Sequence, residues 1–384
     1  MREGWKYKKL NDVCQIARGG SPRPINEYIT DKPNGINWIK IGDAVDGDKY
    51  IRSTKEKIKP EGMSKSRFVH RGDFILSNSM SFGRPYILDI DGCIHDGWLV
   101  LHDTNNLYIK DFLYYLLSSP WMYAEFKTLA VGGVVNNLNS KLVGNVMVPI
   151  PSIDIQQSIV SELDEINNLL SLKRKELETY DKLAQSLFCE MFGDPVENEM
   201  GWEVKKLGDI AFYPNKRIQM SVISAQEYVG VENLIKNRGG VQFSEKSPNA
   251  DTATEFQTDD ILIGNIRPYL KKIWKADKYG GASGDVIIIR IADTFKEKLY
   301  PLYLYKTLST DTFFDYNNAN THGAKMPRGD KKAIAKYSIP LPPLPLQQLF
   351  AQRIEAIEEQ KVHVKAAIEK LETLFAARMQ YWFD

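Results

Sequence analysis

Two stretches of the chain carry apolar residues at the spacing of a long amphipathic helix. In the first, apolar side chains recur at steps of three, four or seven residues, at Ile155, Ile159, Leu163, Ile166, Leu170, Leu177, Tyr180, Ala184, Leu187 and Met191. The second stripe consists of Leu346, Phe350, Ile354, Ile357, Val364, Ile368, Leu371 and Phe375. Prolines precede both stripes, and Gly193-Asp194-Pro195 follows the first. The pattern predicts two helices of about 36 residues, each about 54 Å long.

A stripe with this spacing is normally a packing seam rather than a cofactor site. The second stripe repeats the register of the first at an offset of 191 residues. Two such helices can satisfy both seams by packing on each other about a pseudo-two-fold axis, which makes the pair antiparallel. We therefore expect an antiparallel coiled coil with a globular body at each end, in which the length of the helices sets the distance between the two bodies.

Outside the helical stretches, short apolar runs bounded by Gly, Pro, Asn and Asp predict strands separated by turns, as in 36–44, 74–78 and 286–290. Residues 111–127 and 302–317 have the periodicity of shorter amphipathic helices. Strands and helices alternate along both halves of the chain. The expected fold class is mixed α/β, with two globular domains joined by the two long helices.

The sequence contains an internal duplication. Four segments return in the same order: GWKYKKLNDV (4–13) as GWEVKKLGDI (201–210), RGDFILSN (71–78) as TDDILIGN (258–265), FLYYLLSS (112–119) as YLYKTLST (303–310), and VPIPSIDIQQ (148–157) as IPLPPLPLQQ (339–348). This order indicates a tandem unit of roughly 190 residues. The segments between these anchors share little pattern, which favours two modules of one architecture with different binding preferences. Neutral drift after duplication is the alternative.

Composition narrows the class of protein. Hydrophobic residues make up 43% and charged residues 26%, the balance of a folded globular chain rather than a disordered or fibrous one. The chain has 50 Lys and Arg residues and 49 Asp and Glu residues, so any basic surface that binds nucleic acid must be local. Cys14, Cys93 and Cys189 fit neither a disulfide framework nor a CxxC site. With no secretory leader or long uncharged apolar stretch, we expect a cytoplasmic protein with no membrane partner.

Motifs of catalysis and nucleotide binding are absent from the sequence. There is no GxxxxGK[ST] loop, no GxGxxG between a strand and a helix, no HExxH and no GxSxG. His95 and His102, near Cys93 and Asp96, resemble a metal site only superficially, because residues 98–101 between them read as a strand. The sequence thus predicts no catalytic residue and no metal site.

Several short motifs together resemble one family. They are the GW-x-x-KKL-x-D openings, RGGSP at 18–22, WIKIGD at 38–43, GD-x-I-L at 72–76, PIP or PLPP followed by QQ, and a heptad helix that ends at FGD. Their order and their duplication are similar to those of the specificity subunit of type I restriction-modification systems. The resemblance covers nearly the whole chain.

This resemblance implies a non-catalytic subunit that reads a bipartite target in double-stranded DNA, one half-site per recognition domain. The implied domains are residues 1–153 and 195–344 for recognition, and 154–194 and 345–384 as spacer helices. The helix pair would dock two modification subunits, which carry the adenine N6-methyltransferase, while restriction subunits carry the motor and the nuclease. S-adenosylmethionine, ATP and Mg would bind those partners, leaving this chain without a cofactor.

Two features depart from the family pattern. Residues 214–221 read PNKRIQMS where the first repeat has RGGSPRPI at 18–25, so the glycine-rich turn is missing from the second repeat. The sequence also ends at Asp384, directly after the second stripe. Closure of a cyclic arrangement would therefore rest on the N-terminal segment.

Candidate DNA contacts are cationic or amide side chains beside turn residues, because Arg and Lys bind phosphates and Arg, Asn and Gln bind base edges. In the first repeat they are Arg18, Ser21, Arg23, Lys65, Arg67, Asn78, Ser79, Arg84, Asn136 and Asn137. In the second they are Lys216, Arg217, Gln219, Arg238, Asn265, Arg267, Lys271, Lys272, His322, Lys325 and Arg328. For any single one, a hydrated surface side chain is the alternative. We interpret Trp38, Trp98, Trp121 and Trp274 as structural.

Two functions of other classes remain open at this point. A stand-alone DNA-binding regulator would use the same modules without an enzyme partner, and would bind its site alone instead of co-purifying with a methyltransferase. A structural scaffold would use the helices for assembly only, which leaves the two divergent, loop-rich modules unexplained.

Overall fold

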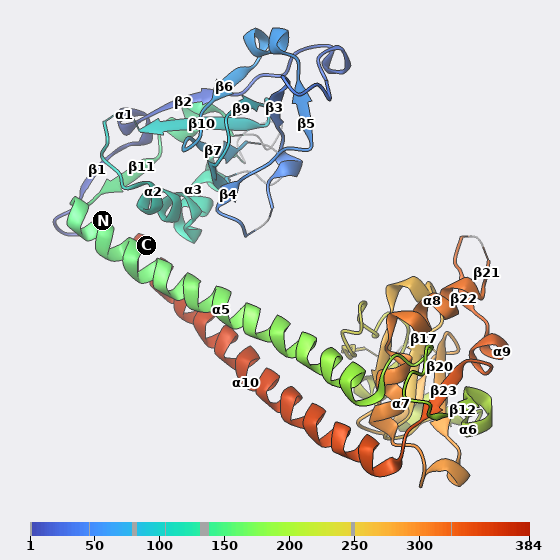
Figure 1. Cartoon of the computed structure of the whole chain (residues 1–384). Coiled ribbons are helices and arrows are strands. Elements are labelled where there is room, and N and C mark those ends of the chain that lie inside the picture. The colour runs from blue at the N-terminus through green and yellow to red at the C-terminus, as the bar shows by residue number, and fades with distance from the viewer. Residues whose placement is uncertain are drawn as a thin grey trace. The chain divides into compact units, whose positions relative to one another are not determined.

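The computed structural model describes residues 2–45, 47–78, 83–103, 105–130, 138–246, 250–323 and 325–384 (Figure 1). The chain divides into two compact units, residues 1–174 with 366–384 and residues 175–365. Both boundaries fall inside long helices, α5 (Ile153–Phe192) and α10 (Leu344–Phe383). Each unit therefore contains a part of both helices.

The first unit contains two main sheets. The larger has the strand order β2-β10-β7-β8-β4 and consists of β2 (Cys14–Arg18), β10 (Trp98–Asp103), β7 (Phe74–Ser77), β8 (Pro85–Leu88) and β4 (Tyr50–Ile51). The second has the order β5-β3-β9-β6 and consists of β5 (Glu56–Ile58), β3 (Ile36–Ile39), β9 (Gly92–Ile94) and β6 (Arg67–Val69). A separate ladder joins β1 (Lys6–Lys9) to β11 (Met147–Ile150). The helices are α1 (Leu10–Val13), α2 (Lys110–Ser118), α3 (Pro120–Ala130) and α4 (Ser140–Gly144).

The second unit repeats this plan. Its first sheet has the order β13-β20-β17-β18, from β13 (Ala211–Phe212), β20 (Val286–Ile291), β17 (Ile261–Gly264) and β18 (Ile273–Lys275). The other has the order β14-β16-β19-β15, from β14 (Arg217–Gln219), β16 (Thr252–Phe256), β19 (Gly280–Ala282) and β15 (Tyr228–Val229). Two ladders join β12 (Glu203–Lys206) to β23 (Ser338–Leu341) and β21 (Thr321–His322) to β22 (Arg328–Gly329). The helices are α6 (Leu207–Ile210), α7 (Pro301–Leu308), α8 (Asp311–Ala319) and α9 (Lys331–Ile334).

The two repeats share the centre of the second main sheet of each unit and differ at its edge. In both, one parallel pair (β3 with β9, β15 with β19) continues into an antiparallel neighbour (β6 or β16). The outer strand differs, because β5 flanks β3 in the first unit whereas β14 flanks β16 in the second. The duplicated scaffold thus presents different edges.

The predicted shorter helices are each broken in two. Residues 111–127 fall on α2 and α3, which meet at Ser119 and Pro120. Proline lacks the amide hydrogen needed inside a helix but is well suited to its first turn, so Pro120 begins a new helix instead of continuing α2. The stretch 302–317 also divides, into α7 and α8, but no proline lies at this break; the Thr310 side chain caps α8 by accepting a hydrogen bond from the Phe313 amide.

The apolar stripes of the long helices lie in the cores of the two units. Ile159 and Leu163 of α5 pack with the sheet and α2 of the first unit, together with Phe383 from the end of α10. In the second unit, Leu187 of α5 and Phe350 of α10 pack around the β20 sheet. The prediction of a buried seam is confirmed for most of the stripe residues. Ile155 is 37% exposed, and seven others are half-buried: Leu177, Tyr180, Met191, Leu346, Ile368, Leu371 and Phe375.

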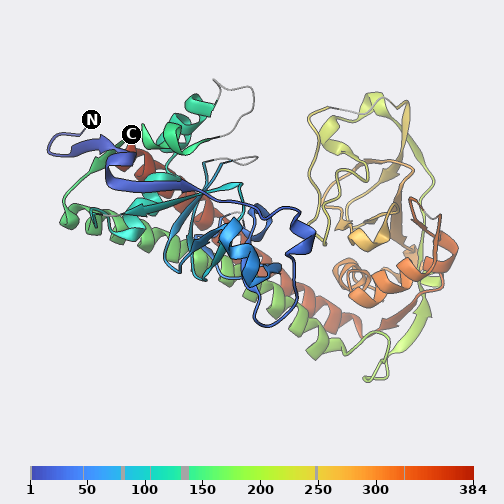
Figure 2. The same cartoon turned by 90° about the horizontal axis from the view of Figure 1, so that it is seen from above.

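Within each unit the α5 and α10 segments lie side by side and run antiparallel (Figures 1 and 2). In the first unit, Glu162 accepts two hydrogen bonds from Arg378, one of them at 2.9 Å, and Arg174 pairs with Glu372 at 2.8 Å. From the first pair to the second, the residue number rises in α5 and falls in α10, so the two segments run antiparallel. In the second unit, Asp181 of α5 pairs with Lys361 of α10 at 2.8 Å.

The N-terminal segment packs against the end of α10 inside the first unit. The Arg2 guanidinium carbon lies 4.4 Å from the ring centre of Tyr381 and 4.9 Å from that of Trp382, distances typical of cation–π contacts. Trp5 lies at the edge of the same core. In the second unit the repeated tryptophan, Trp202, donates from Nε1 to the carbonyl of Phe192 at the end of α5. The GW motifs thus secure the helix ends.

A buried glutamine fastens each long helix to its unit. Gln347 accepts a hydrogen bond from the Tyr300 amide and donates Nε2 to the carbonyls of Lys298 and Pro342, at 2.7–2.9 Å. Gln156 makes the equivalent three bonds in the first unit, at an offset of 191 residues. Both side chains are fully buried. The first glutamine of each QQ pair is therefore a structural residue that satisfies otherwise orphaned backbone groups.

Replacing Gln347 with Ala is expected to lower the free energy of unfolding by about 3 kcal/mol, because each buried backbone group left without a partner costs about 1–3 kcal/mol. Gln348→Ala is the matched control, since the Gln348 side chain is exposed. Urea unfolding followed by tryptophan fluorescence measures both variants. Equal stability of the two would contradict the structural role of Gln347.

Candidate nucleic-acid interface

In the first unit, the predicted contact residues of the 18–23 loop gather around the turn between β9 and β10. The Ser21 hydroxyl donates to Asp96 Oδ1 at 2.8 Å, and Arg18 Nε donates to the Asp96 carbonyl at 3.0 Å. His95 Nε2 lies 2.9 Å from the same carboxylate, and Arg23, whose side chain is 83% exposed, lies 3.8 Å from it. Asp96 thus organises a group of mostly cationic side chains.

Two glycines allow this loop to lie against the β9–β10 turn. The Gly19 amide donates to the Trp98 carbonyl and the Gly20 amide to the Ile94 carbonyl. A Cβ at Gly19 would lie 2.2 Å from the carbonyl oxygen of His95, so no larger residue fits without moving backbone. The RGG sequence therefore sets the position of Arg18 and Ser21 through close backbone contact.

Asp96 keeps its negative charge in this setting. Burial raises its pKa, but the Ser21 hydrogen bond and the charges of His95 and Arg18 lower it, and the net effect is a lowered pKa. The cations nearby include Arg67, whose Nε donates to the Arg18 carbonyl at 2.7 Å, and Lys65, whose Nζ donates to the Tyr28 hydroxyl. Arg18, Arg23, Lys65 and Arg67 are all exposed. We call Arg18, Arg23, Lys65 and Arg67 the first-unit cation cluster.

An asparagine occupies the same junction in both units. The Asn78 amide donates to the Gly97 carbonyl, and its own carbonyl accepts from Leu138. In the second unit the Asn265 amide donates to the Asp285 carbonyl, and its carbonyl accepts from Gly329. The Asn78 side chain also donates to the Asp96 carbonyl at 3.0 Å. The junction therefore joins the end of β7 or β17, the turn before β10 or β20, and the segment before α4 or α9.

Arg84 is exposed directly before β8. Ser79, Asn136 and Asn137 lie outside the described residues. Their contribution to binding stays a prediction.

In the second unit, three candidates lie on the edge strand β14 or directly before it. Arg217 donates to the hydroxyls of Thr254 and Thr252 at 2.9 and 2.7 Å. Lys216 pairs with the buried Glu255 at 2.7 Å, and Gln219 is exposed. The missing glycine-rich turn is replaced here by a strand, which fixes the backbone through the β14–β16 ladder.

The remaining candidates of the second unit surround the segment 265–272 and the β21–β22 hairpin. Arg238 and Lys271 both pair with Asp311, the latter at 2.5 Å. Lys272 Nζ donates to the Val231 carbonyl at 2.6 Å, and burial lowers the pKa of this amine. These three cations have partners inside the protein. The sequence did not show which cations are paired in this way and which are not. Arg328 pairs with Asp285 at 3.0 Å and His322 faces Asp330 at 3.5 Å, while Lys325 is exposed in the hairpin.

Comparisons with known proteins agree with this duplicated arrangement. The family model described as type I restriction modification DNA specificity domain matches twice, over residues 2–179 and 199–373. The chain belongs to the type I restriction-modification specificity family. The predictions of family and of a duplicated, mixed α/β fold are confirmed.

Two curated relatives come from Methanocaldococcus jannaschii. The putative type I restriction enzyme MjaX specificity subunit is 25% identical, over 96% of this chain and 91% of the relative. The MjaIX specificity subunit is 27% identical, over 54% of this chain and 51% of the relative. A chain solved in work on complex assembly and conformational transition of a type I restriction-modification system has the same fold, with a TM-score of 0.64, 17% identity and coverage of 100% and 98%.

The sequence did not identify the acidic residues of this specificity subunit that hold its cations. Asp96, Asp285 and Asp311 are not among the predicted contacts, because carboxylates do not donate hydrogen bonds to phosphates. The Asp96-Gly97 pair is a typical turn signal and could have marked the turn before β10. For Asp311 no signal exists in the sequence, since its partner Arg238 is 73 residues away. Trp38, Trp98 and Trp274 are buried, as expected for structural residues.

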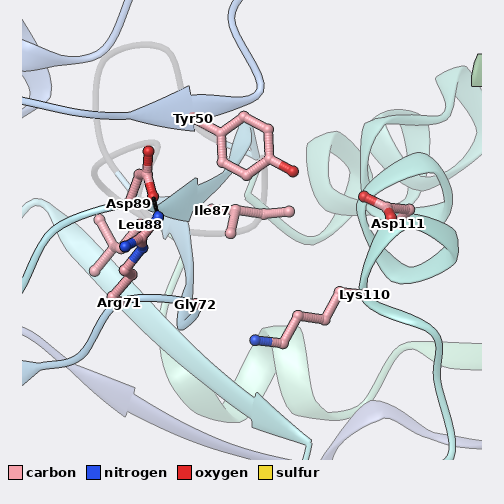
Figure 3. A pocket seen from close by; sticks show the side chains of 8 residues that line it. All are labelled: Tyr50, Arg71, Gly72, Ile87, Leu88, Asp89, Lys110 and Asp111. Carbon is pink, nitrogen blue, oxygen red and sulfur yellow. Dashed lines mark ion pairs between the residues drawn. The ribbon is translucent and has the colours of Figure 1, made fainter.

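A hollow in the first unit contrasts with the cation cluster (Figure 3). Its charged lining consists of Arg71, Lys110, Asp89 and Asp111, with Arg71 paired to Asp89 at 2.7 Å. Two cations and two carboxylates of the lining balance in formal charge, unlike the mostly cationic group around Asp96. Lys49, beside the hollow, also pairs with Asp111.

Across the described ranges, no three His, Cys, Asp or Glu side chains lie close enough to hold a metal ion. None of the helices in that part of the chain combines the length and the hydropathy needed to cross a bilayer.

Asp311→Asn is expected to destabilise the second unit in a pH-dependent way. Hydrogen bonds from Lys271 and Arg238 lower the pKa of Asp311 from 3.8 to about 2. The stabilisation is therefore fully present above about pH 4 and is lost as the pH falls towards 2. The carboxylate is largely exposed, so the effect at neutral pH is at most about 1 kcal/mol.

Urea titrations at pH 7 and pH 3 measure this effect, and the difference between the variant and the wild type should shrink at the lower pH. Asp315→Asn, an exposed position on the same helix, is the matched control. A deficit that grows as the pH falls would contradict the assignment.

Proposed function

We propose that each unit of this specificity subunit reads one half of a bipartite DNA target and that catalysis belongs to other chains. The observation that carries this proposal is one scaffold used twice with different contact residues. The asparagine junction recurs in both units, whereas the loops beside it differ. Recognition of two different half-sites needs this combination, because a common scaffold sets position and variable side chains set the sequence preference.

The first unit offers phosphates a local positive surface on a chain of formal charge +1. Its cation cluster includes three arginines. Arg18 and Arg23 contact Asp96, and Arg67 donates to the Arg18 carbonyl, so these contacts limit their freedom in the absence of DNA. A preorganised set of cations loses less side-chain entropy on binding. In the second unit, β14 and the 265–272 segment supply the corresponding donors from different positions of the scaffold.

We further propose a cytoplasmic complex in which two modification subunits bind the α5–α10 pair and restriction subunits join them. S-adenosylmethionine, ATP and Mg would be bound by those partners. Exposed apolar residues on the helices, such as Leu172 at 61% and Val362 at 64%, support a protein contact there.

Methylation mapping of the genome tests the function directly. Deleting the gene should abolish N6-methyladenine at one bipartite motif, and restoring the gene should return it. The chain should also co-purify with a methyltransferase. A stand-alone regulator, by contrast, would bind its DNA site without any partner and leave every methylated motif unchanged, and this result would overturn the proposal.

Replacing Arg18, Arg23 and Arg67 with Ala should reduce the salt dependence of DNA binding. Each phosphate contact contributes about 0.9 to the slope of log K against log salt, so the slope should fall by up to about 2.7. Lys205→Ala removes a half-buried cation that pairs with Glu203 on β12, and serves as the control. An unchanged slope in the triple variant would exclude these arginines from the interface.

A further inference from the structure

The backbone of Arg267 has a conformation that residues other than glycine rarely adopt. Its φ is 54° and its ψ is 66°, in the left-handed region. Lys271, at the other end of the short turn Pro268–Leu270, has φ 51° and ψ 48°. The left-handed region is unfavourable for a residue with a Cβ and free of that penalty for glycine. An arginine at position 267 therefore has a conformational cost that a glycine would avoid.

The surrounding structure holds this conformation in place. The Arg267 amide donates to the Pro327 carbonyl at 2.7 Å, and the Arg267 carbonyl accepts from Leu270 at 2.9 Å. Ile266 forms a bridge with Arg328 at the start of β22, and Gly329 donates to the Asn265 carbonyl at 3.2 Å. The β21–β22 hairpin, labelled in Figure 1, thus fixes the segment from both sides of Arg267.

The Arg267 side chain differs from its cationic neighbours. Lys271 is paired with Asp311, Lys272 with the Val231 carbonyl, and Arg328 with Asp285. Arg267 is exposed, and its guanidinium has no hydrogen-bond or ion-pair partner among the residues that the structure describes. A rigid, strained backbone therefore carries one exposed guanidinium whose hydrogen-bonding capacity is unused.

We propose that Arg267 reads a guanine in the half-site of the second unit, donating two hydrogen bonds to O6 and N7. This inference rests on the proposed function. A phosphate contact tolerates a flexible cation, because charge alone provides most of the attraction. A bidentate contact with a base edge requires a planar guanidinium in a defined direction, which a fixed backbone helps to supply. Strained residues retained by their surroundings are typical of functional positions.

The experiment uses the full chain in complex with its modification subunits, on duplexes of the motif found by methylation mapping. Each position of both half-sites is substituted in turn, and affinity is measured for the wild type, Arg267→Lys and Arg267→Gly. In Arg267→Lys, preference for guanine at one position should fall by about 5- to 150-fold, the equivalent of 1–3 kcal/mol per bidentate contact. Its salt slope should stay unchanged, because the charge is kept.

Arg267→Gly separates recognition from folding. Glycine adopts the left-handed backbone without strain, so the midpoint of thermal unfolding should be equal to that of the wild type or higher, while the same preference for guanine is lost. Asn237→Gly is the matched control, since it relieves the same kind of strain (φ 56°) at an exposed residue that is not among the predicted DNA contacts. Its base preferences should equal those of the wild type.

Three results would overturn the inference. A selective wild-type complex whose preferences all survive Arg267→Lys would remove Arg267 from base reading. A uniform loss of affinity in Arg267→Gly across all duplexes, with a slope lower by about 0.9, would make Arg267 a phosphate contact instead. A wild-type complex that binds all duplexes alike would overturn the proposed function together with this inference.

Discussion

Each unit of this protein depends on helix segments that come from two distant parts of the chain. The first core closes over Ile159 and Leu163 of α5 and over Phe383 of α10, while the second closes over Leu187 and Phe350. Apolar side chains on the sheets would remain in water without these helices, so folding of either unit requires both. The buried glutamines Gln156 and Gln347 fix where each helix begins, because they satisfy the backbone of the segments that enter it.

In the duplicated scaffold, the parts that set the position of the contact residues are separate from the parts that set the DNA sequence preference. Its constant parts are the central strands of each sheet, the asparagine junction and the glutamine contacts, all of which use backbone groups and buried side chains. Its variable parts are a glycine-rich loop around Asp96 in the first unit and an edge strand with a tight turn in the second. Polar loops at the surface can change without loss of the core, so two different half-sites can be read from one architecture.

Carboxylates pair with several of the cations that we predict to contact DNA. Asp96 gathers Arg18, Arg23 and His95, and Asp311 holds Arg238 and Lys271. An ion pair at the surface is weak, so a phosphate can replace the carboxylate as partner. These side chains are therefore oriented before binding while remaining able to exchange partners. Arg267 differs from these cations, because its backbone conformation, and not an ion pair, sets the direction of its side chain.

The sequence by itself determined the two long helices, the duplication and the mixed α/β class, because periodicity and repetition are local or pairwise properties of the chain. It also identified the loops that carry cations, including the RGGSPR segment and the 265–272 segment. Tertiary structure alone decided which of those cations are exposed, since the partners of Arg238 and Lys272 lie 73 and 41 residues away. The left-handed backbone at Arg267 was decided there as well. These features depend on long-range packing and on backbone strain that neighbouring segments stabilise, and neither leaves a pattern in the residues nearby.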